Sequence, residues 1–242
     1  MEEADMATTV MLETKDGEMA LYDAAPEGTP KGAVVVIQEA FGVNDHIEDV
    51  TRRFAAAGYR AVAPHLFYRT GDPVLDYGNI EKVMEHMQAL SREGILADLD
   101  ATLEHLSSGG LAPKRTGIVG FCMGGTVAVL AAATKALGAA ATFYGGGVAE
   151  GRFGMPSLVE LTPQLKTPWL GLYGDLDQGI PVEQVEALRA ALPSAPVPTE
   201  LVRYAEAGHG FHCDLRDSYH EASAKDAWRR TLAWFDKYIE TA

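Results

Sequence analysis

The sequence predicts an α/β fold in which a mostly parallel sheet carries helices on both faces, and three observations support this prediction. Short apolar runs with few charges recur along the chain, as strands that are covered on both faces require. Stretches with apolar residues at helical spacing lie between these runs. The chain has 242 residues, of which 47% are hydrophobic and 22% charged, as in ordinary globular proteins. We therefore expect one α/β domain over residues 1–242.

The expected strands begin with a hairpin at the edge of the sheet. Thr8–Glu13 and Met19–Tyr22 flank Lys15-Asp16-Gly17, which is a turn signal. Further strands are predicted from the apolar runs Ala33–Ile37, Arg60–Ala63, Thr116–Phe121, Ala139–Phe143, Trp169–Tyr173 and Glu200–Tyr204.

Helices are expected between these strands. His46–Ala57 carries Ile47, Val50 and Phe54 at helical spacing. A second such pattern, Ile80–Leu106, is predicted as two helices that meet near Gly94. The remaining predicted helices are Gly125–Lys135, Val182–Leu192 and Ala222–Ile239. Ligands of such sheets bind at the carboxyl ends of the strands, so the residues that follow each strand are the candidates for chemistry.

The formal net charge of −14 limits the kinds of partner. Nucleic acids and anionic membranes both attract clustered Lys and Arg, so neither is expected as a partner. The longest uncharged run, Thr116–Thr134, approaches membrane-spanning length, but Gly120, Gly124 and Gly125 interrupt it and favour a strand, a turn and a helix. A small molecule is the expected partner.

The N-terminus and the cysteines favour a cytoplasmic location. Glu2, Glu3 and Asp5 stand where a signal peptide needs positive charge, and no apolar region follows them. The two cysteines, Cys122 and Cys213, imply no disulfide framework.

The run Gly120-Phe121-Cys122-Met123-Gly124-Gly125 has the pattern of a nucleophile elbow with cysteine in the central position. Glycines on both sides allow a strained turn between a strand and a helix, which exposes the thiol at the N-terminus of the helix, where the dipole favours thiolate. Taken alone, this short motif fits an inert buried cysteine equally well.

Two further residues follow in the chain order expected for such a site. Asp177 comes directly after the predicted strand Trp169–Tyr173, and His209 lies in a Gly-His-Gly turn after the last strand. The imidazole would take the thiol proton, and the carboxylate would fix its tautomer. Asp175 is the alternative acid and His212 the alternative base. The histidines other than His209 are interpreted as surface or polar-rim residues, and Cys213 as part of a polar segment.

Three segments together resemble the dienelactone hydrolase family: Gln38-Glu39-Ala40-Phe41-Gly42-Val43-Asn44, the elbow Gly120–Gly125, and Gly208-His209-Gly210-Phe211. The resemblance covers most of the chain, from the first buried strand to the C-terminal helix. It implies an α/β-hydrolase fold and the hydrolysis of a small ester or lactone. No metal or organic cofactor is implied. His209, His212 and Cys213 lie close together in the sequence, but no second pair of metal ligands accompanies them.

The resemblance also implies residue roles. Cys122, Asp177 and His209 would form the catalytic triad, and Glu39 would lie near the thiol and help to govern its orientation and protonation. The backbone N–H groups of Ala40 and Met123 would form the oxyanion hole, and the elbow rule independently predicts the second of these. The alternative interpretation of Glu39 is a solvated loop carboxylate.

The sequence departs from the family where arginines hold a substrate carboxylate. Cys213 occupies the position four residues past His209, and Tyr77–Met87 offers only Lys82. Arg69 and Arg152 are either substitutes from other loops or surface charges. Neutral esters are therefore expected to be hydrolysed at least as well as anionic lactones. The alternatives are a promiscuous carboxylesterase or thioesterase and, in another class, a non-catalytic binding protein.

Overall fold

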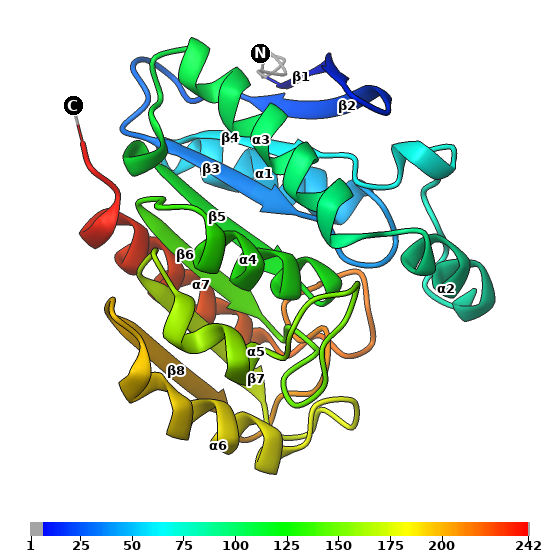
Figure 1. Cartoon of the computed structure of the whole chain (residues 1–242), viewed down its shortest axis with the longest axis vertical. Coiled ribbons are helices and arrows are strands. Elements are labelled where there is room, and N and C mark those ends of the chain that lie inside the picture. Colours follow the sequence, from blue (N-terminus) through cyan, green and yellow to red (C-terminus); the bar gives the residue numbers. More distant parts are fainter. Residues whose placement is uncertain (1–6, 242) are drawn as a thin grey trace.

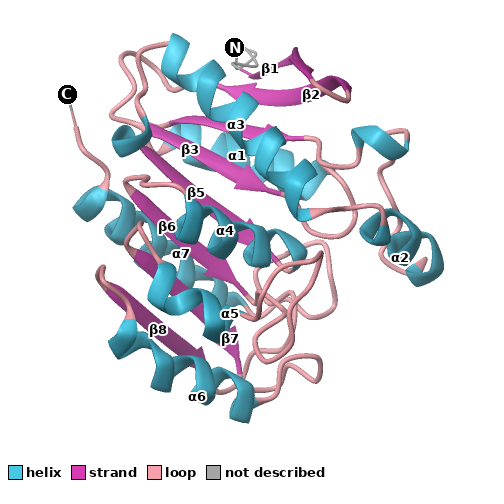
Figure 2. Cartoon of the chain, viewed as in Figure 1, coloured by secondary structure: helices cyan, strands magenta, loops and turns pink. Residues whose placement is uncertain are grey.

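The computed structural model describes residues 7–241, which form an eight-stranded sheet in the order β1-β2-β4-β3-β5-β6-β7-β8. β2 pairs antiparallel with both β1 and β4, while β3 to β8 are parallel. Figures 1 and 2 show α1 and α7 behind this sheet and α3, α4 and α6 in front of it. The predicted α/β fold with helices on both faces is confirmed. The N-terminal residues Glu2, Glu3 and Asp5 lie outside the described residues.

The strands follow the apolar runs of the sequence closely. Their bounds are β1 Ala7–Thr14, β2 Gly17–Ala24, β3 Ala33–Ile37, β4 Arg60–Pro64, β5 Thr116–Phe121, β6 Ala139–Phe143, β7 Trp169–Gly174 and β8 Thr199–Tyr204. Every residue of β3, β5, β6 and β7 is buried, as expected for strands with helices on both faces.

The helices are α1 Asp45–Ala56, α2 Ile80–Gln88, α3 Arg92–Ser108, α4 Met123–Thr134, α5 Leu158–Leu161, α6 Val182–Ala191 and α7 Glu221–Tyr238. The predicted pair of helices over Ile80–Leu106 is confirmed, but the helices are separated at residues 89–91 rather than at Gly94, which lies in the first turn of α3. The side chain of Ser91 accepts a hydrogen bond from the Gly94 N–H and so caps this helix at its start.

The residues of the predicted site lie at the same end of the sheet, beyond the carboxyl ends of the parallel strands. Cys122 follows β5, Asp177 follows β7, and His209 lies in the loop after β8, all beyond the carboxyl ends of parallel strands. The uncharged run Thr116–Thr134 forms β5, the turn at Cys122 and α4. Over residues 7–241, none of the helices is both long enough and apolar enough to span a bilayer.

Candidate active site

Cys122 occupies a sharp turn between β5 and α4. Its backbone has φ 53° and ψ −115°, a strained conformation for a residue with a Cβ atom. A side chain on Gly120 would collide with the Gly124 carbonyl, and one on Gly124 would collide with the Gln38 carbonyl, so glycine is required at both positions. The turn leaves Cys122 partly exposed in front of the first turn of α4.

Asp177 and His209 form a hydrogen-bonded pair beside this cysteine. The buried Asp177 accepts hydrogen bonds at Oδ1 from the N–H groups of Gly179 (2.8 Å) and Ile180 (3.1 Å), and its Oδ2 lies 2.6 Å from His209 Nδ1. Burial favours the neutral imidazole, but the hydrogen bonds to Asp177 and Cys122 and the charges of both groups outweigh it and raise the pKa of His209 to about 10. The structure thus brings together the three residues that the sequence singled out.

The two alternative residues have other surroundings. The carboxylate of Asp175 receives two hydrogen bonds from Arg203, each 2.7 Å long, whereas it is Asp177 that bonds to the imidazole of His209. His212 is buried, and neither ring nitrogen has a hydrogen-bond partner among residues 7–241. Burial lowers the pKa of His212 well below its ordinary value, so the ring is neutral.

The interpretation of the remaining histidines as surface or rim residues is wrong for His46 and His212. Both side chains are about 1% exposed. Their rings lie 6.2 and 5.2 Å from the ring of Phe121, so they pack within the aromatic core behind the site. Burial also lowers the pKa of His46. Aromatic packing, which no local motif signals, accounts for the error.

Glu39 lies at the site as a buried carboxylate, not as a solvated loop residue. It is 1% exposed, and within the described chain neither of its oxygens accepts a hydrogen bond. Its ion-pair partner is Arg216, whose Nη1 lies 3.5 Å from Glu39 Oε1. This arginine was missed at the sequence level, because it stands among charged and polar residues of a loop and reads there as a surface charge.

The guanidinium of Arg216 lies near two aromatic rings and close to Gly210. It lies 5.5 Å from the ring centre of Phe41 and 5.3 Å from that of Tyr77. Gly210 has φ 75°, and a Cβ atom there would come within 2.6 Å of Arg216 Nη1. The turn that carries His209 therefore also makes room for the cation.

Cys213 is buried, although the segment that carries it is polar. Its Sγ lies 3.4 Å from the hydroxyl of Tyr77, which also accepts a hydrogen bond of 3.1 Å from Asn44 Nδ2. Burial raises the pKa of the Cys213 thiol, so the neutral thiol is favoured.

The other basic side chains that the sequence offered as ligands of a substrate carboxylate lie in different parts of the molecule. Arg69 binds Asp98 at 2.7 Å and Asp16 at 2.8 Å, so its guanidinium is not free for a substrate. Arg152 is exposed and lies over Gly146, in the loop after β6. Lys82 is exposed on α2.

The two backbone N–H groups that the sequence singled out belong to Met123 and Ala40. Met123 is the first residue of α4, and Ala40 follows the end of β3. Between residues 7 and 241, nothing accepts a hydrogen bond from the N–H group of either residue. Both residues are buried.

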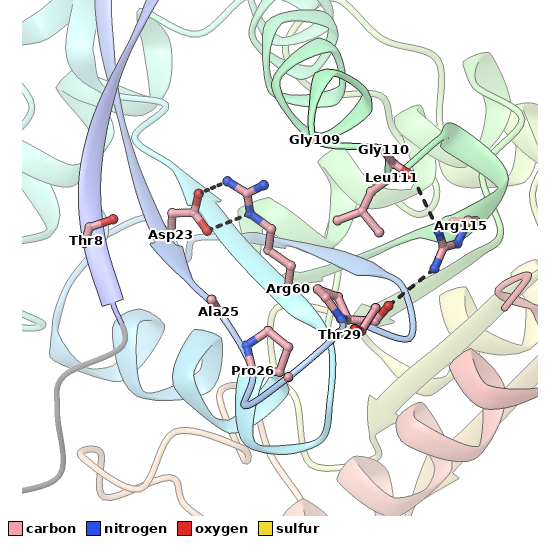
Figure 3. Close-up of a pocket in the computed structure, with 12 residues that line it drawn as sticks. Thr8, Asp23, Ala25, Pro26, Thr29, Arg60, Gly109, Gly110, Leu111 and Arg115 are labelled. Atoms are coloured by element: carbon pink, nitrogen blue, oxygen red, sulfur yellow. Dashed lines mark hydrogen bonds and ion pairs between the residues drawn. The ribbon is translucent and has the colours of Figure 1, made fainter. Parts of the chain in front are cut away.

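A separate pocket of about 520 Å³ lies at the opposite, amino-terminal ends of the strands. Figure 3 shows Arg60 turned to Asp23 and Arg115 turned to backbone oxygens around this hollow. It contains none of the residues singled out from the sequence. Within residues 7–241, no three His, Cys, Asp or Glu side chains are arranged to hold a metal ion.

Comparisons with known proteins agree on one family. A model of the dienelactone hydrolase family matches residues 19–239. A Yersinia pestis protein called "Putative carboxymethylenebutenolidase" is 40% identical over 232 residues, which are 94% of this chain and 86% of that protein. The crystal structure of a "Putative Dienelactone Hydrolase" from Klebsiella pneumoniae is 40% identical, covers 96% of this chain and 98% of its own, and superposes with a TM-score of 0.89. A dienelactone hydrolase-like promiscuous phosphotriesterase from metagenomic libraries, 23% identical over 97% of this chain and 99% of its own, shares the fold with a TM-score of 0.79.

Proposed function

Because this chain belongs to the dienelactone hydrolase family of hydrolases, we propose that it cleaves small esters or lactones with Cys122 as the nucleophile. The observation that carries this proposal is the hydrogen bond of 2.6 Å between His209 Nδ1 and Asp177 Oδ2, beside a cysteine in a strained elbow. A nucleophile, a base and a group that orients the base are the parts that acyl transfer needs.

The proposed reaction has two halves. In the first, His209 takes the proton of the Cys122 thiol, the thiolate attacks the acyl carbon, and the oxygen that gains negative charge accepts hydrogen bonds from the N–H groups of Ala40 and Met123. The ester C–O bond then breaks, and His209 gives its proton to the leaving alcohol. In the second half, His209 takes a proton from water, the hydroxide attacks the thioester, and the acid leaves as the thiol is restored. Asp177 keeps the imidazole in the tautomer that both steps use.

A second candidate function concerns the charge of the substrate. Cys213 is hydrogen-bonded to Tyr77 and carries no positive charge, and Arg216 already forms an ion pair with Glu39. The absence of a free cation at these positions favours the hydrolysis of neutral esters or thioesters. A substrate carboxylate would instead have to share Arg216 with Glu39. A wild-type preference for an anionic lactone over its methyl ester by about one to two powers of ten, lost in Arg216→Gln, would support the anionic substrate. Equal kcat/KM values would support the neutral one.

The proposal is tested by the hydrolysis of p-nitrophenyl acetate by wild type and Cys122→Ala. Wild type is expected to turn over, and the variant to retain only residual activity. Turnover that survives in Cys122→Ala would refute the cysteine nucleophile. No turnover of any short ester, thioester or lactone by wild type would favour a binding protein on the same fold.

A further inference from the structure

The loop that carries Asp177 is short and fixes this carboxylate from within. It connects the end of β7 with the start of α6. The two N–H groups that bond to Asp177 Oδ1 belong to Gly179 and Ile180 of the same loop. These bonds set the place of the carboxylate in the loop, but not the place of the loop relative to His209. The bond of 2.6 Å between Asp177 and His209 therefore depends on contacts that hold the loop itself.

Arg203 binds both ends of this loop. It is the last residue but one of β8, the strand that leads to His209. Its Nε and Nη2 donate hydrogen bonds of 2.7 Å to the two oxygens of Asp175, at the start of the loop. Its Nη1 donates a third bond of 2.7 Å to Glu186 Oε1 in α6, beyond the end of the loop. One guanidinium thus joins both sides of the Asp177 loop to the strand before His209.

The backbones of the two loops also meet near this arginine. The N–H group of Leu176 donates a hydrogen bond of 2.9 Å to the carbonyl of Ala207. Leu176 comes directly before Asp177, and Ala207 lies two residues before His209. A movement of one loop against the other would therefore change the position of Asp177 relative to His209.

The bonding pattern requires an arginine. A guanidinium presents its N–H donors in a rigid planar fork, so it can bind one carboxylate through two bonds and a second carboxylate through a third. A lysine ammonium is a point charge on a flexible chain and does not supply this geometry. The side chains of Arg203 and Asp175 are 28% and 21% exposed, so salt screens the pair less than it screens a pair on an open surface.

We propose that Arg203 is a positioning residue, which clamps the loop of Asp177 to β8 and so keeps this carboxylate within hydrogen-bonding distance of His209. The bonds of Arg203 go to Asp175 and Glu186, so it acts on the triad only through the loop. The inference rests on the proposed function, because it adds a residue to the same site.

The experiment compares wild type with Arg203→Gln, which removes both the charge and the fork. Arg230→Gln is the matched control, because Arg230 also bonds to a carboxylate of β8, Glu200 at 3.2 Å, but lies on α7. The first measurement is kcat and KM for p-nitrophenyl acetate. The second is the far-downfield proton resonance of the hydrogen bond between His209 Nδ1 and Asp177, recorded by NMR at low temperature and identified by its loss in Asp177→Asn. This resonance needs no ester, so a failure of the proposed hydrolysis would be seen separately.

In Arg203→Gln, kcat should fall by about one to two powers of ten with little change in KM, since a misplacement of about 1 Å can cost about 10²-fold in rate. The downfield resonance should weaken or vanish. Arg230→Gln should keep the wild-type kcat and resonance. In the Asp177→Asn background, Arg203→Gln should lower kcat no further, because the group that it positions is already lost.

An unchanged resonance in Arg203→Gln would overturn the proposal, whatever the rate. A loss of kcat of the same size in the Asp177→Asn background would also overturn it, since Arg203 would then act on something other than Asp177. Should Arg203→Gln fail to fold, Arg203→Lys decides, because it keeps the charge and lacks the fork. It should show a smaller loss of kcat and a weakened resonance, and a wild-type resonance would again overturn the proposal.

Discussion

The two cysteines differ in exposure and in the groups around them. Cys122 is partly exposed and close enough to His209 to help raise the pKa of its imidazole, whereas Cys213 is buried against the Tyr77 hydroxyl. Under limited alkylation with iodoacetamide at pH 7.5, Cys122 should therefore be labelled first and activity should fall in step. Peptide mapping by mass spectrometry provides the measurement. Labelling of Cys213 with Cys122 intact and activity lost would contradict the assignment.

The two aspartates after β7 should also behave differently. Asp177→Asn leaves His209 free to adopt the wrong tautomer, so kcat should fall by about 10⁴, the size of this effect in serine enzymes. Asp175→Asn, which weakens only the pair with Arg203, should change kcat far less. Steady-state kinetics with p-nitrophenyl acetate, at matched thermal midpoints, give the comparison. Equal losses in both variants would show that the acid is wrongly chosen.

Single residues were predictable where a local pattern required them. Cys122 stands in a glycine-flanked elbow and His209 in a glycine-flanked turn after a strand, and the structure brings both together with Asp177. Arg216 was not predictable in this way, since its ion pair with Glu39 joins two loops that are distant in the sequence. For the same reason the burial of His46 and His212 could not be read from the sequence.

At the scale of elements, the junction of β5 with α4 depends on glycine. A Cβ atom at position 124 would meet the carbonyl oxygens of Ile37 and Gln38, so Gly124→Ala forces the backbones apart. We expect it to lower stability by about 1–3 kcal/mol and to reduce activity. Gly78→Ala, where no heavy atom lies within 4 Å, should stay within about 0.5 kcal/mol of wild type. Urea unfolding of both variants measures this, and an unaffected Gly124→Ala would contradict the close approach.

The strands were predicted more closely than the helix boundaries. The predicted bounds of β3, β5 and β6 match the structure, because buried parallel strands are continuous apolar runs bordered by polar residues. The start of α3 was misplaced, because glycine was taken as a helix boundary although Ser91 supplies the cap. The single-turn helix α5 was missed, since four residues carry too little periodicity to be recognised.

For the whole molecule, the buried histidines predict acid sensitivity. Burial lowers the pKa of His46 and His212, so the unfolded chain binds protons that the folded chain does not. The stability that these neutral rings contribute is complete above about pH 6.5 and is lost as the pH falls below it, by up to about 1.4 kcal/mol per pH unit for each histidine.

The variant His212→Phe tests whether a buried neutral histidine causes this acid sensitivity. Between pH 6.5 and 5, the free energy of unfolding of His212→Phe should fall less steeply than that of wild type. The two slopes should differ by up to about 1.4 kcal/mol per pH unit, which is the contribution of one histidine. His220→Phe is the control, because His220 is partly exposed and bonds to Ser223. Urea titrations at several pH values give the slopes. Parallel slopes for wild type and His212→Phe would mean that His212 is not buried in its neutral form.

If Cys122 carries the acyl group during turnover, the acyl-enzyme intermediate can be trapped. Wild type is mixed with p-nitrophenyl acetate, quenched in acid within milliseconds, digested and examined by mass spectrometry. We expect one acetyl group on the peptide that contains Cys122, formed and lost at rates compatible with turnover. An acetyl group on another residue, or steady turnover with Cys122 unmodified at every time point, would contradict it.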